Sequence, residues 1–110
     1  MRSLLLLLTL AFATAELSAQ PFITVWKTDN PGTSDDNQIK IPAESTSYNY
    51  DIYWEDISNA EVNGTASGIT GAHTITFPAA GTYRVEISGY FPRIYFNGGA
   101  DKSKIIDVLQ

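Results

Sequence analysis

The sequence has no cysteine, one histidine and few basic residues among its 110, and these shortages narrow what the chain can be. Without cysteine there is no disulfide, so packing and hydrogen bonds must hold the fold, and a zinc site built from cysteine and histidine is excluded. The sequence has seven Lys and Arg and twelve Asp and Glu, which gives a net charge of −5 at pH 7. Nucleic acids and acidic membrane surfaces are bound by clustered Lys and Arg. The composition therefore predicts no nucleic-acid partner.

Long apolar runs are absent except near the N-terminus. Arg2 precedes an apolar run over residues 4–13, and small residues follow, among them Ala15 and Ala19. This order is typical of a secretory signal peptide, and the run is shorter than the roughly 20 residues of a membrane-spanning helix. We predict a helical signal peptide over 1–19, cut after Ala19 or alternatively after Ala15. An uncleaved membrane anchor is the other interpretation. Cleavage would leave a secreted or cell-surface chain without membrane insertion.

After residue 20, short apolar and β-branched runs alternate with clusters of Gly, Pro, Asn, Asp and Ser, which is typical of an all-β protein. The expected strands are 22–28, 38–41, 48–55, 61–65, 72–77, 82–88, 93–96 and 104–109. The strand over 61–65 is expected to be weak and to lie at a sheet edge, and Gly64, Gly68 and Gly71 are expected to mark a mobile stretch. About seven to eight strands in this length predict an antiparallel β-sandwich of immunoglobulin-like size.

The core residues are expected to be large aromatic side chains on these strands. Residues 48, 50, 52 and 54 are apolar or aromatic and alternate with more polar positions, as in a half-buried strand. Tyr53 is out of phase with them and is expected to face solvent. The residues given a structural role are Trp26, Trp54, His73, Phe77, Gly81 and Tyr83. The last of these follows Gly81-Thr82 as in a tyrosine corner, where the hydroxyl bonds to backbone a few residues upstream.

The sequence offers little catalytic or metal chemistry. His73 shares its phase with Ile75 and Phe77, so we interpret it as a hydrogen-bonded strand residue rather than a general base. No Gly-x-Ser-x-Gly nucleophile motif is present, and we predict that the chain is not an enzyme and has no cofactor. Oxygen ligands for Ca²⁺ could come from Asp35, Asp36, Glu55 and Asp56. The Asp-x-Asp-x-Asp-Gly pattern is missing, so solvated polar loops are the preferred interpretation.

Two segments carry a resemblance to a known family. Residues 50–56 read YDIYWED and residues 73–85 read HTITFPAAGTYRV. Together they resemble the PKD-type domain, an immunoglobulin-like β-sandwich. The flanks, PFITVWKTDNPG over 21–32, FPRIYFN over 91–97 and DKSKI over 101–105, look like the N-terminal domain of BspA-family leucine-rich-repeat bacterial surface proteins. One departure is Glu55-Asp56-Ile57, where that pattern has Gly-Asp-Gly after the tryptophan.

The resemblance implies a domain division and a function. It implies a PKD-like sandwich over 20–100 and a C-terminal apolar segment over 101–110, the junction to leucine-rich repeats that full-length relatives carry. It also implies a non-catalytic module of a bacterial surface protein, used for adhesion or as a spacer, with a protein or glycan partner on another cell or matrix.

Three alternatives stay open beside this expectation. The first is a carbohydrate-binding module that uses exposed aromatic side chains. The second is a small hydrolase with His73 in a cleft. The third is a truncated fragment without independent function, which would show an uncovered apolar surface near 105–109.

Overall fold

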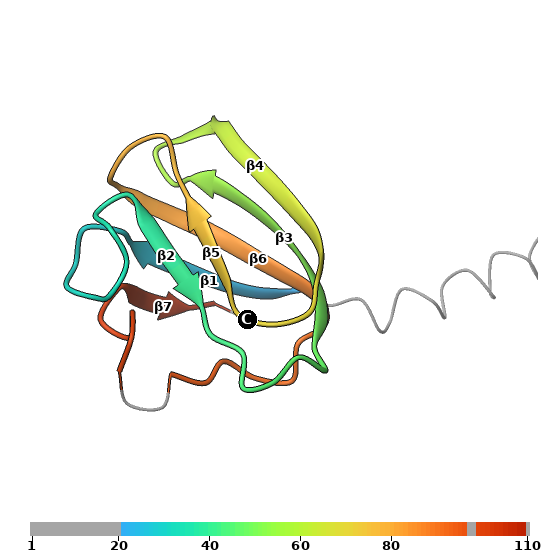
Figure 1. Cartoon of the computed structure of the whole chain (residues 1–110). Helices are drawn as coiled ribbons and strands as arrows, with labels where there is room; N and C mark the ends of the chain where they lie inside the picture. The colour runs from blue at the N-terminus through green and yellow to red at the C-terminus, as the bar shows by residue number, and fades with distance from the viewer. Residues whose placement is uncertain (1–20, 97–98, 110) are drawn as a thin grey trace, which may run out of the picture.

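The computed structural model describes residues 21–96 and 99–109, which form two antiparallel β-sheets facing each other (Figure 1). The strands are β1 (Phe22–Lys27), β2 (Gln38–Ile41), β3 (Asn49–Asp56), β4 (Asn59–Ile69), β5 (His73–Thr76), β6 (Thr82–Tyr90) and β7 (Ile105–Val108). One sheet has five strands in the order β4-β3-β6-β1-β7, and the other pairs β2 with β5. The predicted all-β sandwich is confirmed.

The signal peptide expected over 1–19 lies outside the described residues. Within 21–96 and 99–109 no helix is long and apolar enough to cross a membrane.

Alternation along the strands places one set of side chains in the core between the sheets. On β3 Tyr50 and Ile52 are buried, and on β6 Tyr83 and Val85 are buried, whereas the intervening residues lie on the outer face. Among the expected core residues, Trp26, Phe77 and Tyr83 are fully enclosed. Trp54 is half-buried and packs edge-on against Phe77 and Tyr83, with ring centroids 4.8 and 5.6 Å apart. Each fully buried large side chain contributes about 1.5–3 kcal/mol.

The strand predicted over 93–96 is wrong. Residues 91–96 run without strand pairing and instead place aromatic rings against the core. Phe91 stacks on Tyr50 with centroids 4.9 Å apart, and Phe96 lies 6.0 Å from the Trp26 ring. The aromatic pattern that resembled a strand is used for packing, and Pro92 has no backbone N–H to give to a sheet.

The weak strand predicted over 61–65 is much longer in the structure. β4 extends over 11 residues, Asn59–Ile69, at the edge that the sequence predicted. Gly64 is accommodated because it faces Trp54 across the β3–β4 pair, and a Cβ there would lie 2.5 Å from the indole. The indole covers the space that a side chain would otherwise fill, which compensates for a glycine inside a strand.

The expected tyrosine corner is present at the start of β6. The Tyr83 hydroxyl donates a hydrogen bond to the carbonyl oxygen of Ala79 at 2.8 Å, and the Tyr83 ring stacks on Phe77 at 4.0 Å. Gly81 lies against the same ring, and its N–H donates to the Thr28 hydroxyl at 2.9 Å. The hydroxyl therefore ties the β5–β6 connection to the core.

Replacing Tyr83 with phenylalanine is expected to lower the free energy of unfolding by about 1 kcal/mol or more, because the Ala79 carbonyl loses its partner. Urea unfolding of both proteins measures the difference. Tyr90→Phe, at a tyrosine whose side chain is largely exposed, is the matched control. An unchanged midpoint for Tyr83→Phe would show that the corner does not stabilise the fold.

Candidate functional site

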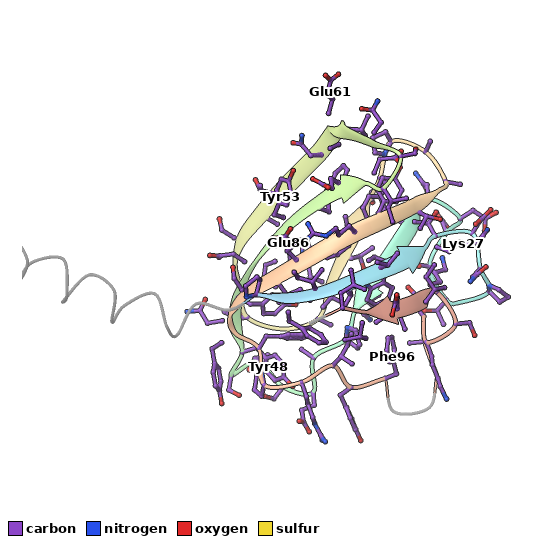
Figure 2. The ribbon with its side chains drawn as sticks, turned by 180° about the vertical axis from the view of Figure 1, so that it is seen from behind. Lys27, Tyr48, Tyr53, Glu61, Glu86 and Phe96 are labelled. Carbon is purple, nitrogen blue, oxygen red and sulfur yellow. The ribbon has the colours of Figure 1, made fainter. Side chains whose placement is uncertain are left out.

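The most distinctive surface of the domain is the outer face of the five-stranded sheet. In the β3–β6 pair Tyr53 lies opposite Glu86 and Asp51 lies opposite Ser88, and in the β3–β4 pair Tyr53 lies opposite Thr65. Alternate residues of a strand share a face, so these side chains come together on one side of the sheet. Figure 2 shows Tyr53 and Glu86 side by side on this face, away from β2 and β5.

These side chains surround a hollow of about 400 Å³. The lining residues are Pro21, Asp51, Ile52, Tyr53, Thr65, Ala66, Ser67, Glu86 and Ser88. The volume falls within the range of about 300–1,000 Å³ that is usual for small-molecule sites. The walls combine an aromatic ring, two carboxylates and three aliphatic hydroxyls, a mixture suited to a polar ligand with one flat apolar side.

Several polar groups in the hollow are fixed by neighbours. The Tyr53 hydroxyl donates to Glu55 Oε1 at 2.9 Å, and this bond, together with burial, raises the pKa of Tyr53. The Arg84 guanidinium pairs with the Glu86 carboxylate. Asp51 Oδ1 accepts a hydrogen bond from the Gly68 N–H at 2.9 Å. The phenol therefore stays protonated at neutral pH, and Asp51 is held facing β4.

Other groups in the hollow have no protein partner within the described part of the chain. These are the hydroxyls of Thr65, Ser67 and Ser88, each of which can donate one hydrogen bond and accept two. The second oxygen of Asp51 is likewise not taken by the Gly68 bond. A ligand in the hollow would thus meet a set of donors and acceptors that the fold leaves unused.

The hollow carries negative charge. Asp51, Glu55 and Glu86 are acidic, and among the residues that the structure describes Arg84 is the one basic residue that pairs with any of them. This balance repels anionic ligands and favours neutral or cationic ones.

The predicted site residues lie elsewhere. His73 is half-buried at the start of β5, opposite Ile41 of β2, and burial lowers its pKa. The hydrogen bond expected for its imidazole is not made to any part of the chain that the structure describes. Among the described residues, no serine or carboxylate is hydrogen-bonded to it.

The weak calcium candidates do not form a cluster. Asp35 and Asp36 are exposed in the loop between β1 and β2. Asp56 Oδ1 accepts hydrogen bonds from the N–H and hydroxyl of Ser58, at 2.9 and 2.8 Å, and Glu55 accepts the Tyr53 hydroxyl. Over 21–96 and 99–109, no group of three or more His, Asp or Glu is placed to hold a metal ion.

A buried charged centre was not predicted from the sequence. Asp101 has no solvent-exposed surface and accepts hydrogen bonds with both oxygens. Oδ1 receives the N–H groups of Thr33 and Ser34 at 2.8 and 3.1 Å. Oδ2 receives the Ser34 hydroxyl at 2.6 Å and the Lys40 N–H at 2.7 Å. Asp101 thus fastens the chain before β7 to the loop between β1 and β2 and to β2 itself.

The second charged side chain in this centre is Lys104, which is also fully enclosed. Its ammonium donates to the carbonyl oxygens of Ser34, Asp35 and Gln38 at 3.1, 2.8 and 3.0 Å, and to the Ser34 hydroxyl at 3.1 Å. The Ser34 hydroxyl therefore lies between the two opposite charges. In the sequence Asp101 and Lys104 belong to an ordinary polar segment, and no local pattern marks them as buried.

The C-terminal segment expected over 101–110 belongs to the sandwich as far as the structure describes it. β7 pairs antiparallel with β1, and the Leu109 N–H donates to the Ile23 carbonyl oxygen at 2.8 Å. Ile105 packs against the core, whereas Ile106, Val108 and Leu109 keep 51, 52 and 54% of their surface exposed. The uncovered apolar surface that the fragment alternative required is therefore present on three of these four residues.

Similarity to known proteins does not identify the site. Comparison of the chain with family models, with curated proteins and with solved structures gives no match. The resemblance to the PKD-like domain of BspA-family surface proteins therefore stays a prediction from the sequence.

Proposed function

We propose that this chain is a non-catalytic module of an extracellular or cell-surface protein, and that it serves adhesion rather than acting as an in-line spacer. The observation that carries the choice is the position of the two described chain ends. Because β1 and β7 are antiparallel neighbours, the start of β1 lies beside the end of β7, and Leu109 bonds to Ile23 directly.

An in-line spacer requires its two ends on opposite sides, so that each copy adds its length to the stalk. Here residues 21 and 109 lie at one end of the sandwich. The connections 28–37, 57–58 and 77–81 gather at the other end, where the Ile57 N–H bonds to the Thr82 carbonyl oxygen and the Thr28 N–H to that of Gly81. A module attached through either end projects away from its attachment. The far loops and the outer sheet face are then available to a partner.

Labels on the two ends test this arrangement directly. The chain has no cysteine, so Pro21→Cys and Leu109→Cys give two unique sites for spin labels on the chain expressed without residues 1–19. We expect a distance at the short limit of pulsed electron resonance, below about 20 Å, since adjacent strands lie about 4.8 Å apart. A control pair at Pro21 and Ser58 should give roughly 25 Å or more, the length of an eight-residue strand. Equal distances for the two pairs would contradict a projecting module.

Adhesion itself is tested with beads that carry the chain at high density. The measurement is the number of beads retained on surfaces coated with glycans or extracellular-matrix proteins. Beads that carry the chain linked through Ser58 are the control for orientation. Linkage through residue 109 should permit binding. Absence of binding in both orientations would contradict the adhesive function.

A further inference from the structure

We propose that the hollow on the outer sheet face, formed by β3, β4 and β6, binds a neutral sugar unit of a glycan. The proposal rests on the adhesive function proposed above and names the chemical class of its ligand. Its residues are Asp51, Tyr53, Thr65, Ser67 and Ser88.

The wall of the hollow fits the two kinds of surface that a pyranose presents. The C–H face of a sugar ring is weakly positive and packs on the negative face of an aromatic ring such as Tyr53. The sugar hydroxyls lie around the edge of the ring and each can donate and accept. Around Tyr53 the hollow offers the hydroxyls of Thr65, Ser67 and Ser88, which have no partner among the described residues. It also offers the second oxygen of Asp51, which can accept from one or two sugar hydroxyls.

Charge selects among sugars. With Asp51, Glu55 and Glu86 set against Arg84, a sialic acid or a uronic acid in the hollow would meet like charge. Glu86 is already paired with Arg84, so the remaining negative charge comes from Asp51 and Glu55. A neutral hexose or N-acetylhexosamine avoids this repulsion and still uses the carboxylate as an acceptor.

The hollow is also preorganised. Its side chains stand on β3 and on the two strands that β3 pairs with, and Tyr53 is in register with both Glu86 and Thr65. Asp51 is oriented by the Gly68 N–H, and the Tyr53 phenol is oriented by Glu55. Groups fixed before binding lose little entropy on binding, which raises the affinity available from a few contacts.

The test is a ¹H–¹⁵N NMR titration of the chain without residues 1–19, using a panel of neutral di- and trisaccharides of glucose, galactose, mannose and N-acetylglucosamine. At least one of these should shift the amide signals of Tyr53, Thr65 and Ser88 in a saturable manner. Tyr53→Ala should weaken that binding about tenfold or more, whereas Tyr53→Phe, which keeps the ring, should retain most of it. Tyr90→Ala removes an aromatic side chain that is 60% exposed outside the hollow and should leave the affinity unchanged. Thermal melting of each variant confirms that it is folded.

Four results overturn the proposal. The first two are no saturable shift with any neutral sugar, and shifts centred outside the hollow. The third is equal affinity for Tyr53→Ala and the unchanged chain. The fourth is tighter binding of a lysine-rich peptide, titrated in the same way, than of any of the sugars. The bead assay separates this failure from failure of the proposed function. Beads of Tyr53→Ala that still adhere would keep adhesion and reject the hollow as its site. If the beads never adhere but a sugar still binds the hollow, the adhesive function is contradicted and the sugar site is retained.

Discussion

Replacing Asp101 with asparagine is expected to lower the free energy of unfolding by about 3 kcal/mol or more, because several hydrogen bonds to a buried carboxylate are lost or weakened and each is worth roughly 1.5–3 kcal/mol. Asparagine has nearly the size of aspartate, so no cavity explains the loss. The substitution removes the negative charge that the Ser34 hydroxyl links to the buried Lys104 ammonium. It also turns one acceptor oxygen into an NH₂ group, which then faces either the N–H groups of Thr33 and Ser34 or the Lys40 N–H and the Ser34 hydroxyl.

Urea unfolding monitored by Trp26 and Trp54 fluorescence gives the measurement for Asp101→Asn. Asp36→Asn is the matched control, because Asp36 is exposed on the same loop that Asp101 fastens. The control should change stability by less than about 0.5 kcal/mol. A loss for Asp101→Asn no larger than that of the control would show that the buried centre does not stabilise the fold.

The stability difference between Asp101→Asn and the unchanged chain is expected to depend on pH. Burial alone would raise the pKa of Asp101, but the hydrogen bonds from the Ser34 hydroxyl and from three backbone N–H groups outweigh it, so the pKa lies below its ordinary value. The unfolded chain therefore takes up this proton first as the pH falls. The stabilisation by Asp101 is complete above about pH 4 and is lost as the pH falls through the folded-state pKa. The difference between Asp101→Asn and the unchanged chain should accordingly shrink below pH 4, and a constant difference would contradict the ionised centre.

The parts of the fold that can be predicted from the sequence are those where the residues of a single strand show a clear pattern. Alternation over 48–55 and 82–88 is enough to say which side chains are buried, and Gly81 before Tyr83 indicates the corner. The buried centre gives no such signal, because its hydrogen bonds join residues 33–40 to residues 101–104. A polar segment in the sequence looks the same whether it is solvated or enclosed by a distant loop.

The hollow was predicted only in part, and for a related reason. Period-two alternation placed Tyr53 on the face away from the core. It could not say that Tyr53 would lie between Thr65 and Glu86, because that depends on the register of three strands. The strand predicted over 93–96 is wrong for a different reason. An aromatic pattern indicates burial, and burial was obtained there by packing on the core without any sheet pairing.

Gly89→Ala is expected to destabilise the domain by about 3 kcal/mol, from two separate causes. Gly89 has a φ of +98°, a region that costs a residue with a Cβ roughly 1–2 kcal/mol. A Cβ there would also lie 2.8 Å from the Asn49 carbonyl oxygen and 3.1 Å from the Tyr50 Cα. Both are backbone atoms of the paired strand β3, so the two strands must separate to make room, at a cost of about 1–3 kcal/mol.

Two other glycines separate these causes. Gly68 has a φ of +65°, but a Cβ at that position would have nothing within 4 Å, so Gly68→Ala reports the backbone conformation alone and should cost about 1 kcal/mol. At Gly71 the nearest atom is the Thr46 methyl at 3.8 Å and φ is ordinary, so Gly71→Ala should be neutral or slightly stabilising. Chemical denaturation of the three variants gives the comparison. If Gly89→Ala costs no more than Gly68→Ala, β3 and β6 have room to adjust at Tyr50, and the close approach of the two backbones does not constrain the sheet.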